Sequence, residues 1–75
     1  MKYKHITIEP SYKEGHGHYV YRIVNNKSNK LLGMIFWYAQ WRQYVCEFTA
    51  GRIFNNSCLR DIIKFIEERA GEEEK

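Results

Sequence analysis

The sequence has little of what most enzymes and secreted domains are built on. Its 75 residues include two cysteines, one proline and five glycines. It contains no Walker loop, GxGxxG, HExxH or nucleophile elbow. Two cysteines alone match neither a disulfide framework nor a paired CxxC zinc pattern. We therefore expect Cys46 and Cys58 to be reduced, mostly buried thiols in a non-enzymatic protein without a cofactor or metal.

Long apolar segments are also missing. The longest apolar stretch covers residues 31–39, which is far shorter than the ~20 residues that cross a bilayer. The basic start of the chain is followed by alternating polar and apolar residues, whereas a signal peptide has a continuous apolar segment. We expect a cytoplasmic location with no membrane association.

The length leaves room for one core. A chain of 75 residues is about half of an average domain, and such small domains reach a stability of only roughly 3–5 kcal/mol without a staple or a partner. The aromatic content of 16% argues against disorder. These features predict one domain over residues 1–71, followed by a frayed acidic tail over residues 72–75.

Alternating polar and apolar residues, separated by turn residues, predict up to four strands. The first strand should end at Pro10, which cannot donate a ladder hydrogen bond, and a loop should follow to Gly17. An asparagine-rich turn over residues 25–30 predicts a hairpin. The predicted strands are Lys4–Glu9, Tyr19–Asn25, Leu31–Tyr38 and Gln43–Thr49, with a turn over residues 39–42 before the last.

From about Asn56 the apolar residues change to a helical spacing and share one arc of the helix. Asn55 and Ser57 are alternative N-cap residues, and Gly71 is a natural stop. Burial of this arc against a sheet predicts an α+β fold of order ββββα, an antiparallel sheet of three to four strands with one C-terminal helix on one face. The arc consists of Cys58, Leu59, Ile62, Ile63, Phe65 and Ile66.

The segment Leu31–Tyr38 is apolar on both faces of its strand, and a single helix can cover only one face. The other face is covered by loops and the N-terminal segment, or it binds a protein partner or a second copy of the chain. Because Trp, Tyr and Arg dominate interface hot spots, the predicted binding residues are Trp37, Tyr38, Trp41, Arg42 and Tyr44.

Charge is unevenly distributed. Residues 1–60 contain nine Lys and Arg against three Asp and Glu, and residues 61–75 contain three against six. A basic surface with interleaved aromatics is typical of single-strand nucleic-acid binders, although an ordinary solvated face has the same composition. Nucleic-acid binding is therefore the alternative function, and its predicted residues are Arg22, Lys27, Lys30, Arg42 and Arg52.

Two weaker patterns concern metal binding and nucleophilic catalysis. His16 and His18 lie two residues apart and, with His5 or a cysteine, have the ligand types that zinc prefers. The remaining ligand spacing is missing, so a polar loop is the preferred interpretation. Cys58 lies in the first turn of the helix, where the amide groups favour a thiolate, but its place on the apolar arc favours burial.

Three segments resemble small uncharacterised proteins of bacteria and their phages: residues 32–38, 41–48 and 58–66, which read LGMIFWY, WRQYVCEF and CLRDIIKFI. The resemblance covers about half of the chain. It implies a phage or mobile-element origin and, because small phage proteins often occlude a surface of a host protein, an inhibitor of host defence. It implies no catalytic residues.

Overall fold

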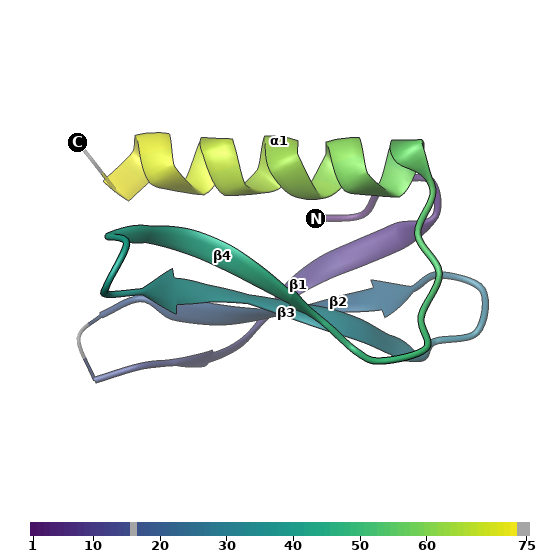
Figure 1. Cartoon of the computed structure of the whole chain (residues 1–75), viewed down its shortest axis with the longest axis horizontal. Helices are drawn as coiled ribbons and strands as arrows, with labels where there is room; N and C mark the ends of the chain where they lie inside the picture. Colours follow the sequence, from purple (N-terminus) through teal and green to yellow (C-terminus); the bar gives the residue numbers. More distant parts are fainter. Residues whose placement is uncertain (16, 74–75) are drawn as a thin grey trace.

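A four-stranded antiparallel sheet followed by one helix forms the structure, a computed structural model that describes residues 1–15 and 17–73 (Figure 1). The predicted α+β fold of order ββββα is confirmed. The elements are β1 (Ile6–Lys13), β2 (Tyr19–Asn25), β3 (Leu31–Tyr38), β4 (Gln43–Phe48) and α1 (Asn56–Glu73).

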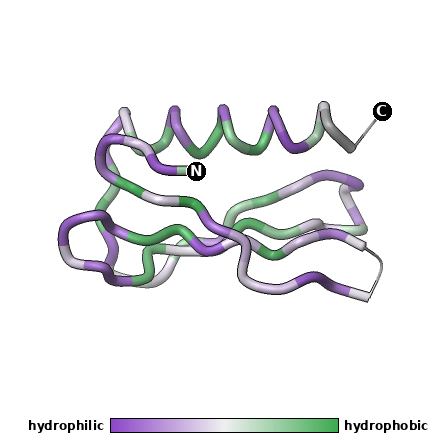
Figure 2. Tube along the Cα trace, turned by 180° about the vertical axis from the view of Figure 1, so that it is seen from behind, coloured by the Kyte–Doolittle hydropathy of each residue, from purple (hydrophilic) through white to green (hydrophobic). Residues whose placement is uncertain are grey.

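The strands lie side by side in chain order, β1-β2-β3-β4, so β1 and β4 are the two edges of the sheet. Helix α1 runs along one face of this sheet (Figure 1). Its hydrophobic residues lie on the side turned towards the strands and its hydrophilic residues on the outer side (Figure 2). The core between the layers contains Ile6, Ile8, Tyr21, Ile23, Leu32, Ile35, Tyr44, Cys58, Ile62 and Phe65.

Four predicted boundaries are wrong. Strand β1 begins at Ile6 and not at Lys4, and β4 ends at Phe48 and not at Thr49. The other two concern the ends of β1 and α1. Strand β1 continues through Pro10 to Lys13. Pro10 is tolerated because β1 is an edge strand and because the register shifts directly after it, between Pro10 and Tyr12. Helix α1 continues through Gly71 to Glu73, since a glycine inside a helix costs only about 1 kcal/mol. Residues 74–75 of the predicted tail lie outside the described residues.

The predicted turn and cap residues form the expected hydrogen bonds. The Asn25 side-chain oxygen accepts bonds from the amides of Lys27 and Ser28 at 2.8 and 2.9 Å, which fixes the β2–β3 turn as an asparagine side chain commonly does. The Asn55 side-chain oxygen accepts a bond from the Cys58 amide at 2.8 Å. Asn55 is therefore the N-cap of α1.

The N-terminal residues extend the sheet at its β1 edge. Lys2 pairs with Thr7 in an antiparallel bridge, and Met1 exchanges two hydrogen bonds with Ile8. The N-terminus lies between β1 and α1, on the helix side of the sheet (Figure 1). Within residues 1–15 and 17–73, no helix or further strand lies over the face opposite α1. We call this uncovered side the open face.

Candidate functional site

The open face has an aromatic patch at the end of the sheet that contains the β3–β4 turn. Phe36 and Val45 are paired neighbours on β3 and β4, and Tyr38 lies two residues beyond Phe36 on the same side of the strand. Trp41, in the turn, is 65% exposed and meets Tyr38 edge to face, with ring centres 5.0 Å apart. We call these four residues, Phe36, Tyr38, Trp41 and Val45, the open-face patch.

The patch surrounds a shallow hollow of about 260 Å³. It is lined by the four residues of the patch together with Cys46 and Glu47. Val20 is only 2% exposed, although within residues 1–15 and 17–73 no helix or further strand covers the open face. The patch is thus a largely apolar surface with a shallow opening.

Two predicted binding residues belong to the opposite face. Tyr44 is 4% exposed and is part of the core under α1, and Trp37 is partly buried against that core. Their rings meet edge to face at 5.4 Å. The imidazole of His18 stacks on Trp37 with ring centres 4.3 Å apart and planes 6° from parallel. Trp37 and Tyr44 therefore stabilise the fold on the helix side and are not anchors on the open face.

The predicted basic residues are dispersed. Arg22 lies on the open face but donates to the Glu9 carboxylate at 2.9 Å. Lys27 and Lys30 lie at the β2–β3 turn, and Arg52 donates to the Leu31 carbonyl near the same end. Arg42 lies in the β3–β4 turn, at the opposite end, with a φ of 54°. Only Arg42 adjoins the open-face patch, so no continuous basic and aromatic strip forms.

Sequence reasoning missed Phe36 and Val45 as binding residues and missed Tyr12 as an exposed aromatic on the open face. The alternation of Met34, Phe36 and Tyr38 along one strand contained the signal for Phe36. Tyr12 was assigned to a loop, but it pairs with Val20 beyond the register shift and is exposed.

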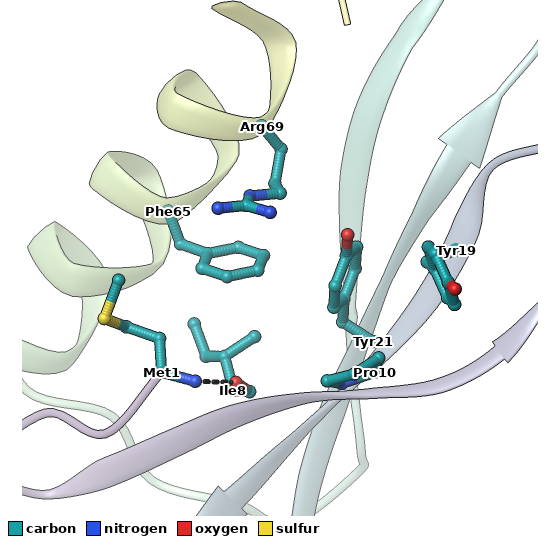
Figure 3. Close-up of a pocket in the computed structure, with 7 residues that line it drawn as sticks. All are labelled: Met1, Ile8, Pro10, Tyr19, Tyr21, Phe65 and Arg69. Carbon is teal, nitrogen blue, oxygen red and sulfur yellow. Dashed lines mark hydrogen bonds between the residues drawn. The ribbon is translucent and has the colours of Figure 1, made fainter. Parts of the chain in front are cut away.

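A second cavity of about 450 Å³ lies between α1 and the β1–β2 edge of the helix face (Figure 3). The Phe65 ring and the Arg69 guanidinium extend from the helix, 5.2 Å apart, towards Tyr21 on the sheet. The amino group of Met1 donates to the Ile8 carbonyl at its floor. The residues that line this cavity are Met1, Ile8, Pro10, Tyr19, Tyr21, Phe65 and Arg69.

The two cysteines are partly or fully buried. Cys58 is buried in the core. Burial, and then the charge of Glu47, raise the pKa of Cys46 from 9.0 to about 11, so its nucleophilic thiolate is disfavoured. In the described part of the chain, no three His, Cys, Asp or Glu side chains come close enough to hold a metal ion. His16 of the predicted metal alternative lies outside the described residues.

No helix within residues 1–15 and 17–73 has the length and apolar character needed to span a membrane. Comparisons of the chain with protein-family models, with curated proteins and with solved structures find no match. The resemblance to small phage and bacterial proteins therefore stays a prediction.

Proposed function

We propose that this chain is a non-enzymatic protein-binding domain that uses the open-face patch. The observation that carries the proposal is the placement of Trp41, exposed beside Tyr38 on the side of the sheet that α1 leaves uncovered. Tryptophan and tyrosine in such positions are the most common hot spots of protein interfaces. A cytoplasmic location and a role against host defence remain sequence-based predictions.

The chemistry of the patch favours a protein partner over nucleic acid. The hollow has apolar walls and a carboxylate from Glu47, which repels a phosphate backbone. The nearby cation Arg22 is already paired with Glu9. An apolar or aromatic side chain of a partner fits the hollow, and a basic group beside it complements Glu47. Arg42 at the turn offers an acidic group of the same partner a second contact.

Binding is tested by selecting ligands from a random peptide library against the domain and measuring their affinity by calorimetry. We expect the selected peptides to contain an aromatic or aliphatic residue next to Lys or Arg. Trp41→Ala should weaken them by about 2 kcal/mol, the threshold of a hot spot. Tyr19→Ala is the matched control, because Tyr19 is an exposed aromatic that lines the cavity on the helix side.

A mixed-sequence single-stranded oligonucleotide tests the alternative in parallel. If the domain binds it, with an affinity that falls steeply with salt and is reduced by substitution of Lys27 or Lys30, nucleic-acid binding replaces the proposal. Peptide affinities that are insensitive to Trp41→Ala and sensitive to Tyr19→Ala would also contradict it, because the ligand site would then lie on the helix side.

A further inference from the structure

The outer edge of β1 is closed by the chain itself. The Ile8 carbonyl accepts a hydrogen bond from the Met1 amino group, and the Ile8 amide donates to the Met1 carbonyl. The Ile6 carbonyl accepts a bond from the Tyr3 amide at 2.8 Å. The next outward residue, Pro10, has no N–H to offer. This edge is therefore blocked in the way that natural sheets block unwanted pairing.

Within the described residues, the outer edge of β4 has no such protection at Cys46 and Phe48. The Thr49 amide donates to the Leu32 carbonyl at 2.9 Å, which marks this pair as hydrogen-bonded. Because bonded and non-bonded pairs alternate in an antiparallel ladder, Cys46 and Phe48 direct their backbone groups away from β3. Within residues 1–15 and 17–73, no backbone group bonds to them. The strand contains neither lysine nor proline, which commonly block edges.

An apolar flank of α1 lies above this open edge. Phe65 lines a cavity together with Met1, Ile8 and Pro10, so the flank of α1 on the Phe65 side lies over β1 and the N-terminal segment. At 100° per residue, Leu59 and Ile63 lie on the other flank. That flank faces β4, the strand whose backbone comes closest to the helix. Ile63 is 57% exposed there.

Exposed apolar side chains occur both at the edge and on the flank. Phe48, at the end of β4, is 46% exposed and packs against Phe54 with ring centres 4.4 Å apart. Leu59 and Ile63 are exposed along α1, and Ile53 is exposed in the connecting loop. Exposed apolar groups beside unpaired strand groups are the features of a sheet edge that pairs with another chain.

We propose that this surface is the interface of a homodimer, in which β4 pairs antiparallel with the β4 of a second copy. A twofold axis perpendicular to the sheet then joins two four-stranded sheets into one of eight strands. Such an interface must be complementary to itself. It places both helices on the same side, so that the flanks with Ile63 meet above the joined strands.

The register follows from which residues face each other. With the axis at Cys46, Phe48 lies opposite the partner's Tyr44 and Val45 opposite the partner's Glu47, which separates the two Glu47 carboxylates. An axis at Glu47 opposes two like charges. An axis at Val45 places Phe48 opposite the partner's Arg42, whose φ of 54° takes it out of strand geometry. The axis at Cys46 is therefore the one that β4 accommodates.

A typical dimer interface would bury about 800 Å² on each partner, roughly a seventh of the 5456 Å² that the single chain exposes. A dimer also supplies the partner that a domain of this size needs to exceed its marginal stability. This interface adjoins the open-face patch at Val45, which lies opposite the partner's Glu47. Pairing at β4 leaves Phe36, Tyr38 and Trp41 of the patch uncovered and brings two copies of them to one extended sheet.

Sedimentation velocity of the full chain from micromolar to millimolar concentration tests the dimer. We expect a monomer–dimer equilibrium in the wild type. Ile63→Lys should raise the dissociation constant of the dimer by at least about tenfold. The substitution places two positive charges, one from each copy, in the apolar contact, where they repel each other. Lys64→Ala, on the other flank of the same turn, and Trp41→Ala, on the open face, should leave the constant unchanged.

Crosslinking with a short bifunctional maleimide at alkaline pH tests the register. The C58S protein, which retains Cys46, should give a covalent dimer, and the C46S protein should give none. A wild type that is monomeric at every concentration overturns the proposal. A dimer that Ile63→Lys leaves intact and that does not crosslink through Cys46 overturns it as well. Neither result bears on peptide binding, so the failure of one proposal is distinguishable from the failure of the other.

Discussion

Neighbouring residues of β3 on opposite faces of the sheet give the sharpest test of the architecture. Ile35 is 0% exposed in the core under α1. Phe36, the next residue, is half-buried on the open face. If one face contains the core and the other is left for binding, truncation of these two side chains must differ strongly in its effect on stability and on ligand affinity.

The magnitudes follow from burial. Ile35→Ala removes a fully buried side chain and should cost about 2–5 kcal/mol, which is most of the roughly 3–5 kcal/mol expected for a domain of this size. Ile35→Val should cost about 0.5–1.5 kcal/mol and lower the Tm by about 4–8 °C per kcal/mol. Phe36→Ala should cost about 1 kcal/mol, because full burial of such a ring supplies only about 1.5–3 kcal/mol.

Urea unfolding followed by circular dichroism measures the free energy of each variant, and calorimetry with a selected peptide measures its affinity. We expect Ile35→Val to lose stability and keep the affinity, and Phe36→Ala to stay folded and lose the affinity. The reasoning is refuted if Phe36→Ala destabilises the protein as much as Ile35→Ala. The open face would then also contain a hydrophobic core, or would contain it in place of the helix side.

Three further predictions concern the backbone, the helix cap and pH. Gly33→Ala should destabilise by about 1–3 kcal/mol, because its Cβ would lie 2.5 Å from the Glu47 carbonyl oxygen. Asn55→Ala should cost about 0.5–2 kcal/mol through loss of the N-cap bond. The raised pKa of Cys46 means that its stabilising contribution is complete below pH 9 and is lost as the pH rises through about 11. C46S should reduce this alkaline loss.

Each of these three predictions has its own control. Urea unfolding measures the free energy of unfolding of every variant. Gly15→Ala meets no atom within 4 Å, and a stability change as large as that of Gly33→Ala would contradict the clash. Asn56→Ala alters the neighbouring asparagine without removing the cap, so equal losses would reject Asn55 as the cap. Part of the alkaline loss should remain in C46S, because the pKa of Tyr3 is raised too. An unchanged pH dependence would refute the role of Cys46.

The order of the strands and the helix was predictable because turn and cap residues mark where these elements begin and end. Asn25 and Asn55 form the turn and cap that their side chains favour in any context. The continuation of β1 through Pro10 was not predictable, because it depends on β1 being an edge strand and on the register shift beside it. Edge position is a property of the whole sheet and has no signal in the neighbouring residues.

The candidate site was predictable in part. Two apolar rows in β3 indicate that one helix leaves one of them uncovered, and the structure has this arrangement. Which row α1 covers depends on packing: Ile8, Ile23 and Ile35 form a fully buried layer, and this layer places Trp37 and Tyr44 on the helix side. The sequence-based prediction combined residues from both faces of the sheet. It selected them by residue type and did not apply the alternation of side chains along each strand.

The two tryptophans provide the most direct test of the central claim, that the uncovered side of the sheet binds the partner. Trp37 packs on the helix side beside His18, and Trp41 lies exposed on the open face. Their indole N–H signals can be followed separately by NMR during titration with a selected peptide. We expect the Trp41 signal to shift while that of Trp37 stays in place. A shift of Trp37 with Trp41 unchanged would contradict the account.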